Sequence, residues 1–78
     1  MQSFKITLSS VSDVKQFVDA AAQYSGDVDV VSGRYTVNGK SIMGLFSIDL
    51  SDPVRVDVQG SEEEAAAFRA SVAEFIAE

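Results

Sequence analysis

The chain switches between two hydrophobic periods, and these switches predict its secondary structure. Apolar and polar residues alternate singly in four short segments, as in strands with one buried face. These predicted strands cover residues 4–8, 27–31, 35–37 and 54–58. Two longer segments, residues 11–25 and 62–77, carry apolar residues three and four positions apart, which is typical of amphipathic helices.

Between the third and fourth predicted strands, the segment KSIMGLF also has helical spacing. Ile42, Leu45 and Phe46 stand at positions i, i+3 and i+4, so we expect a short helix with Ser41 as its N-cap. A short helix at the edge of a small domain cannot bury every apolar side chain. We expect Leu45 and Phe46 to be buried and Ile42 and Met43 to be exposed.

Capping signals frame the two long helices. Ser61 and Glu64 fit the capping-box spacing S-x-x-E, and Ser10 with Asp13 resembles the same arrangement. Gly26 is expected to end the first long helix. We therefore interpret the serines at these positions as helix caps.

The predicted order of elements is β-α-β-β-α-β-α, which indicates the α+β class. Strands with one apolar face need cover on that face only, so we expect a four-stranded antiparallel sheet with the helices on one face. The other face should be solvated and carries Lys5, Thr7, Asp27, Asp29, Arg55 and Asp57. A chain of 78 residues is expected to form a single domain, residues 1–78.

Composition and charge narrow the function classes. The formal net charge of −6 disfavours phosphate backbones and anionic membrane surfaces, so we expect neither nucleic acid nor a membrane as a partner. The chain has no cysteine and no histidine, which removes the usual metal ligands and the usual general base. We therefore expect no metal site, no cofactor and no enzymatic activity. A cysteine-free core suits the reducing cytoplasm.

The segment KSIMGLFSIDL resembles the K-S-I-M-G-x-x-S-x segment around the regulatory serine of HPr-type phosphocarriers from Gram-positive bacteria. HPr is a component of the sugar phosphotransferase system. The stretches QFV and YSGDVDV also fall where that family has similar residues, and the element order matches over nearly the whole chain. The resemblance implies an HPr-like open-faced β-sandwich.

The resemblance also implies two candidate sites, of which this chain matches one. Ser41 stands at the regulatory serine, which a dedicated HPr kinase phosphorylates, and Lys40, Ile42 and Met43 surround it. The family's phospho-accepting histidine precedes the first helix, but the corresponding residues 9–13 read SSVSD. The chain thus resembles histidine-less, Crh-type HPr paralogues.

We interpret the chain as a regulatory protein that acts through protein contacts, as a cytoplasmic monomer. An HPr-kinase-type enzyme would phosphorylate Ser41, and the patch of Lys40, Ile42 and Met43 would contact a regulator or enzyme. Two alternatives remain open: an adaptor that is never phosphorylated, and a small-molecule-binding α+β domain of the ACT type.

Overall fold

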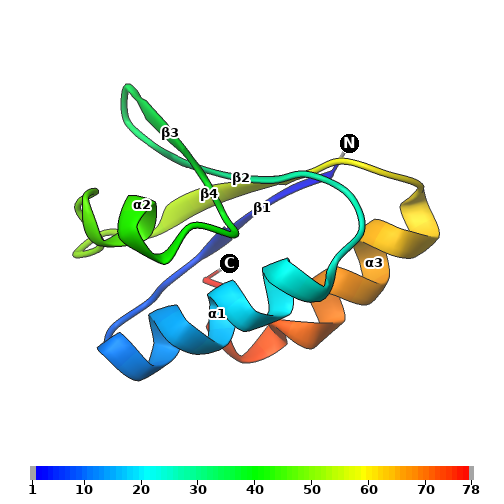
Figure 1. The fold of residues 1–78 in the computed structure, drawn as a ribbon, viewed down its shortest axis with the longest axis horizontal. Coiled ribbons are helices and arrows are strands. Elements are labelled where there is room, and N and C mark those ends of the chain that lie inside the picture. The colour runs from blue at the N-terminus through cyan, green and yellow to red at the C-terminus, as the bar shows by residue number, and fades with distance from the viewer. Residues whose placement is uncertain (1, 78) are drawn as a thin grey trace.

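The computed structural model describes residues 2–77 and confirms the predicted α+β architecture, with the helices packed on one face of an antiparallel sheet (Figure 1). The predicted element order is also confirmed. The elements are β1 (Gln2–Ile6), α1 (Val11–Gln23), β2 (Val28–Ser32), β3 (Tyr35–Asn38), α2 (Ile42–Phe46), β4 (Val54–Val58), α3 (Glu62–Ser71) and a 3-10 turn (Ala73–Phe75).

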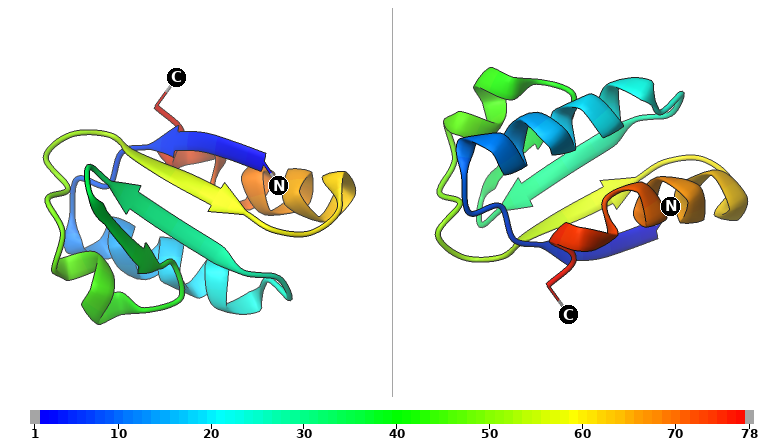
Figure 2. Two further views of the ribbon diagram at one scale, coloured as in Figure 1. Left: turned by 90° about the horizontal axis from the view of Figure 1, so that it is seen from above. Right: turned by 90° about the horizontal axis from the view of Figure 1, so that it is seen from below.

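The sheet has the strand order β1-β4-β2-β3, and every neighbouring pair is antiparallel. One row of paired residues crosses all four strands: Phe4, Val56, Val30 and Val37. Phe4, Val30 and Val56 are buried, because the helices cover this face. Figure 2 shows the opposite face of the sheet bare of helices, as the alternation predicts.

The long helices α1 and α3 lie side by side beneath the sheet and run in opposite directions (Figure 2). Phe17 of α1 meets Phe68 of α3 edge to face, with ring centroids 5.9 Å apart. Phe4 of β1 packs against the same Phe68 ring at 6.5 Å. These aromatic side chains join both helices to the sheet through one core.

The first long helix ends earlier than the sequence predicts. Its last residue is Gln23, and Tyr24 already has an extended backbone. The Tyr24 hydroxyl donates a hydrogen bond to the carbonyl oxygen of Gln59. A Cβ on Gly26 would lie 2.7 Å from that same carbonyl oxygen. Gly26 therefore serves a close approach of two chain segments and does not end the helix.

The prediction that the last helix continues to residue 77 is also wrong. The helix α3 ends at Ser71, whose hydroxyl donates to the carbonyl oxygen of Phe68 over 2.6 Å. The chain then runs along β1: Thr7 N–H donates to Phe75 O at 2.8 Å and Ala77 N–H to Lys5 O at 2.9 Å. These hydrogen bonds pair backbone groups at the outer edge of β1, and residues 75–77 could not form them if they continued the helix.

Within residues 2–77, every helix is too short or too polar to cross a membrane.

Candidate functional site

Ser41 is the N-cap of α2, as the sequence predicts. Its backbone is extended, and its Oγ accepts a hydrogen bond from Gly44 N–H at 3.1 Å. Its carbonyl oxygen accepts the N–H of Leu45, also at 3.1 Å, which closes the first turn. The side chain of Ser41 is half-buried. Ser41 is therefore the N-cap of α2 at a partly exposed position.

A tight turn fixes the position of Ser41 at the end of β3. The Asn38 side chain accepts the N–H of Lys40 at 2.9 Å, and the Asn38 carbonyl oxygen accepts the N–H of Ser41 at the same distance. Between them, Gly39 is pressed against β2, where a Cβ would lie 2.8 Å from Val28 Cγ1. Only glycine fits this approach, so the turn that presents Ser41 is anchored to the sheet.

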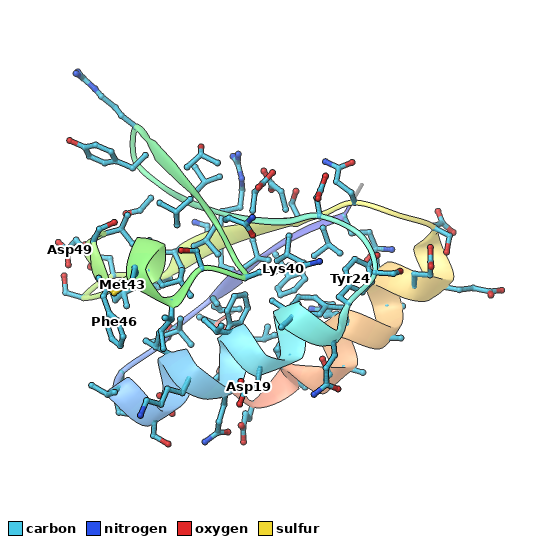
Figure 3. The ribbon with its side chains drawn as sticks, in the orientation of Figure 1. Asp19, Tyr24, Lys40, Met43, Phe46 and Asp49 are labelled. Atoms are coloured by element: carbon cyan, nitrogen blue, oxygen red, sulfur yellow. The ribbon has the colours of Figure 1, made fainter. Side chains whose placement is uncertain are left out.

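Lys40 has a partner elsewhere in the molecule. Its Nζ donates to the carbonyl oxygen of Tyr24 over 2.8 Å, just beyond the last residue of α1. Figure 3 shows Lys40 and Tyr24 together, away from Met43 and Phe46. The ammonium thus ties the end of α1 to the turn before α2, and a partly buried lysine in this position has less freedom to contact other proteins.

The exposed face of α2 differs in part from the prediction. Leu45 is fully buried and Met43 is 76% exposed, as expected. Phe46 was expected in the core but is 46% exposed, and Ile42 was expected outside but packs half-buried against the core. Leu45 already fills the space beneath this short helix, so Phe46 is left at its rim.

Phe46 borders a groove that the sequence did not reveal. The groove has a volume of about 460 Å³ and lies between the start of α1 and the end of α2. Leu8, Val11 and Leu50 also line it, together with several hydroxyl-bearing residues. Val11 is 58% exposed although its spacing from Val14 places it on the apolar stripe of α1. Hydrophobic periodicity alone gives no signal for such exposure, because it depends on what packs opposite the stripe.

The start of α1 is closed by its own side chains. Ser10 Oγ accepts the N–H of Asp13 at 3.1 Å, which confirms the expected cap. The carboxylate of Asp13 accepts both the N–H and the hydroxyl of Ser9, each at 3.0 Å. These hydrogen bonds lower the pKa of Asp13 below its ordinary value, and the one from the Ser9 backbone N–H has the largest effect. An anionic carboxylate therefore occupies the donors that precede this helix.

No group of three or more histidine, cysteine, aspartate or glutamate side chains is arranged to hold a metal ion in residues 2–77.

Comparison with known proteins identifies the family. A family model described as "PTS HPr component phosphorylation site" matches residues 13–78. A search among curated proteins found no match.

Solved structures share the fold along almost the whole chain. HPr-C-His from Thermoanaerobacter tengcongensis has a TM-score of 0.77 and 25% identity, and the match covers 95% of this chain and 93% of that one. Crh, the catabolite repression protein of Bacillus subtilis, has a TM-score of 0.68 and 30% identity, with 94% and 88% covered. The phosphocarrier protein HPr of Bacillus anthracis has a TM-score of 0.67 and 26% identity, with 90% and 94% covered.

These matches confirm the resemblance drawn from the KSIMG segment, and they replace the ACT-type interpretation. The chain belongs to the HPr family of the phosphotransferase system.

Proposed function

We propose that this HPr-family protein regulates other proteins through direct contacts, and that phosphorylation of Ser41 by an HPr-kinase-type enzyme switches those contacts. The observation that carries the proposal is the position of Ser41. This half-buried residue caps α2 through its hydroxyl, two residues before the highly exposed Met43. The KSIMG match to the family's regulatory serine supports the same assignment.

We do not propose that the protein relays a phosphoryl group from one protein to another. The sequence contains no histidine, and phosphoserine esters are poor phosphoryl donors compared with phosphohistidine. At the start of α1, Ser9 and Ser10 are engaged with Asp13 in capping hydrogen bonds. We therefore propose a non-catalytic regulator and not a carrier in a transfer chain.

The contact surface we propose centres on α2. The KSIMG motif points to Lys40, Ile42 and Met43, but exposure favours Met43 together with Phe46. A phosphate on Ser41 adds about −1.5 to −2 charges at neutral pH beside these apolar side chains. A partner that pairs a cationic group with an apolar pocket would then bind the two phosphorylation states with different affinity.

In the protein without a partner, Lys40 would form an ion pair with a phosphate on Ser41. Lys40 directly precedes Ser41 in the sequence, and its ammonium donates a hydrogen bond to the Tyr24 carbonyl oxygen. A dianionic phosphate attracts this ammonium more strongly than a neutral carbonyl oxygen does. We propose that phosphorylation draws Lys40 away from Tyr24 and loosens the tie between α1 and the turn before α2.

We propose that the protein acts as a monomer in the cytoplasm. The related Crh of Bacillus subtilis is described as a domain-swapped, intertwined dimer. In this chain the segment that joins β1 to α1 is short, Leu8 within it is buried, and Ser9 is hydrogen-bonded to Asp13. Size-exclusion chromatography with light scattering should give the mass of one chain, and a stable dimer would contradict this part of the proposal.

Phosphorylation can be tested by incubating the protein with ATP and a bacterial HPr kinase, followed by intact-mass spectrometry. We expect wild type to gain one phosphate and Ser41→Ala to gain none. Ser47→Ala is the matched control, because Ser47 lies at the other end of α2 and caps it through the Gly44 carbonyl oxygen. A phosphate adduct on Ser41→Ala, or none on wild type, would reject the modification.

One observation favours a second candidate, an adaptor that is never phosphorylated. Ser41 Oγ is already used as the hydrogen-bond acceptor that starts α2. Affinity capture from a bacterial cytosolic lysate, with wild type and Ser41→Asp as baits, separates the two functions. The regulated function predicts different partners for the two baits, whereas the adaptor predicts the same partners.

A further inference from the structure

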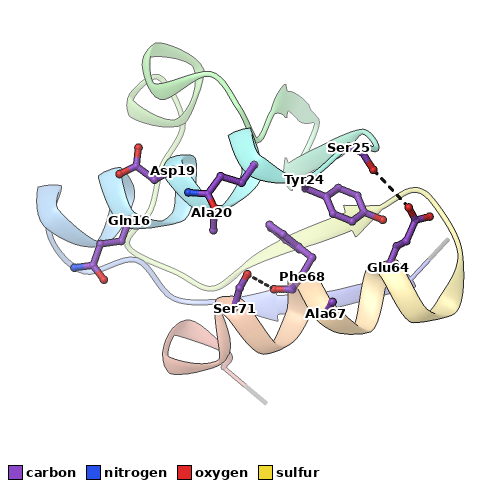
Figure 4. A pocket seen from close by; sticks show the side chains of 10 residues that line it. Gln16, Asp19, Ala20, Tyr24, Ser25, Glu64, Ala67, Phe68 and Ser71 are labelled. Carbon is purple, nitrogen blue, oxygen red and sulfur yellow. Dashed lines mark hydrogen bonds between the residues drawn. The ribbon is translucent and has the colours of Figure 1, made fainter.

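A second groove lies between α1 and α3, and α2 contributes no residue to it (Figure 4). Its volume is about 570 Å³. Gln16, Asp19 and Ala20 line it from α1, and Glu64, Ala67 and Phe68 line it from α3. The spacing of three and four residues on each helix places one stripe of each along the groove.

The inner part of the groove is aromatic and apolar. The rings of Tyr24 and Phe68 meet with centroids 5.4 Å apart and planes tilted by 48°. Ala20 and Ala67 line the groove with methyl groups only, which leaves space between the two helices. Phe68 is only 3% exposed and forms the floor, so the half-buried Tyr24 ring is the aromatic surface beside which a slender aliphatic chain can lie.

Its charged lining is of one sign. Asp19 and Glu64 are the charged residues among the described side chains that line the groove, and both are acidic. Hydrogen bonds from Ser61 lower the pKa of Glu64 and keep its carboxylate ionised, and the one from the Ser61 backbone N–H has the largest effect. Lys40 reaches the Tyr24 carbonyl oxygen nearby but does not line the groove. The burial of Tyr24, and then the charge of Glu64, raise the pKa of the Tyr24 phenol, which agrees with a negative potential here.

We infer that this groove docks a basic segment of a partner protein through an arginine side chain. The aliphatic part of the arginine would lie between Ala20 and Ala67. Its planar guanidinium would stack on the half-buried Tyr24 ring in a groove that Asp19 and Glu64 both line, an arrangement that suits arginine better than lysine. Charge complementarity selects this occupant, because the groove offers two anions and the whole chain carries a net charge of −6.

This docking surface is separate from the Ser41 surface. None of its lining residues belongs to α2 or to the turn before it. The protein can therefore hold one partner at the groove and a second at the Ser41 surface, and the Lys40 bond to the Tyr24 carbonyl oxygen is the link between the two. Ser41→Ala, which leaves Lys40 and every lining residue in place, should not change binding at the groove.

The test is an NMR titration of the ¹⁵N-labelled protein with an acetylated, amidated pentapeptide of alternating alanine and arginine. We expect the largest amide shifts at residues 16–25 and 64–71. Asp19→Asn should weaken binding at least threefold, because Asp19 is exposed and its carboxylate lines the groove. Asp52→Asn, which removes the same charge from an exposed residue outside the groove, should change affinity less than twofold.

A second pair of variants tests the space without changing charge. Ala67→Gln fills the groove and should abolish the shifts, whereas Ala66→Gln alters the adjacent exposed position outside it and should preserve them. Equal effects of either matched pair, or shifts centred elsewhere, would overturn the inference. Free arginine binding as tightly as the peptide would also overturn it, because the groove would then be a small-cation site and not a docking surface.

Discussion

The starts of α1 and α2 are built alike in the backbone and differently in the side chains. Each helix begins with a serine, Ser10 or Ser41, whose Oγ accepts the N–H three residues later at 3.1 Å. That third residue is Asp13 in α1, and its carboxylate takes two further hydrogen bonds from Ser9. In α2 the third residue is Gly44, which has no side chain to add.

The start of α3 shows that α2 is the exception. Ser61 and Glu64 form a complete capping box, with the serine accepting at 3.1 Å and the glutamate accepting from Ser61 N–H at 3.2 Å. Of the three α-helices within residues 2–77, α1 and α3 thus carry their own anion beside the first turn. The glycine in α2 leaves that place free of a carboxylate, which is what a phosphorylated Ser41 would require.

The largest effect should come from removing the platform that both helix starts share. Val56 is fully buried in the row that crosses the sheet, so Val56→Asp places a carboxylate in the apolar core. We expect this variant to lose its cooperative thermal unfolding transition, which circular dichroism measures. Thr36→Asp on exposed β3 is the control and should keep a cooperative transition. A normal melt for Val56→Asp would show that the sheet face is assigned wrongly.

The next effect separates the inner and outer faces of α2. Leu45 is fully buried, so Leu45→Ala should lower the free energy of unfolding by about 2–5 kcal/mol. Met43 is largely exposed, and Met43→Ala should change it by less than about 0.5 kcal/mol. Urea unfolding measures both values. Similar losses for the two variants would mean that Met43 is held by the fold and is not free for partners.

The sequence predicted these faces only in part, and the reason is physical. Periodicity identified the strands, the helix starts and the burial of Leu45, because each depends on local spacing or on a short hydrogen bond. Phe46 and Ile42 were assigned to the wrong sides of α2. Which apolar side chain of a five-residue helix reaches the core depends on how that helix is laid on the sheet.

The same limit applies to long-range contacts. The Lys40 bond to Tyr24 and the pairing of residues 75–77 with β1 join segments far apart in the chain. Local pattern gives no sign of them. By contrast, Ser41 and its neighbours were identified by a motif of consecutive residues, so the candidate site was found although the orientation of its side chains was not.

Removing each cap compares the two helix starts directly. Ser10→Ala should cost about 0.5–2 kcal/mol of unfolding free energy, because it leaves an amide at the start of a 13-residue helix without its acceptor. Ser41→Ala should cost no more, since α2 has only five residues. Urea titration measures both, with Ser12→Ala as the control on an exposed position. A larger loss for Ser41→Ala would show that its hydroxyl is chiefly structural.

Acid unfolding should distinguish the two starts by their charge. The pKa of Asp13 is lowered in the folded protein, so its contribution to stability is complete above the ordinary value of 3.8 and is lost as the pH falls through the folded pKa. Asp13→Asn should therefore flatten the dependence of stability on pH below about pH 4. Denaturation followed between pH 2 and pH 6 tests this, and an unchanged slope relative to wild type would contradict it. Gly44 gives α2 no such dependence.

The smallest effect on stability is expected at Gly44 itself. Alanine is favoured over glycine in a helix by about 1 kcal/mol, but its Cβ would lie 3.3 Å from both Ser41 Oγ and Val37 Cβ. These contacts are tight, so the gain in helix propensity and the crowding should nearly cancel. We expect Gly44→Ala to change the unfolding free energy by less than about 0.5 kcal/mol in urea titration. Because the added methyl group crowds the Ser41 hydroxyl, the same variant should be phosphorylated more slowly by an HPr kinase. An unaltered phosphorylation rate would mean that the glycine does not keep space for a phosphate, and the contrast between α2 and the other two helix starts would then be one of stability alone.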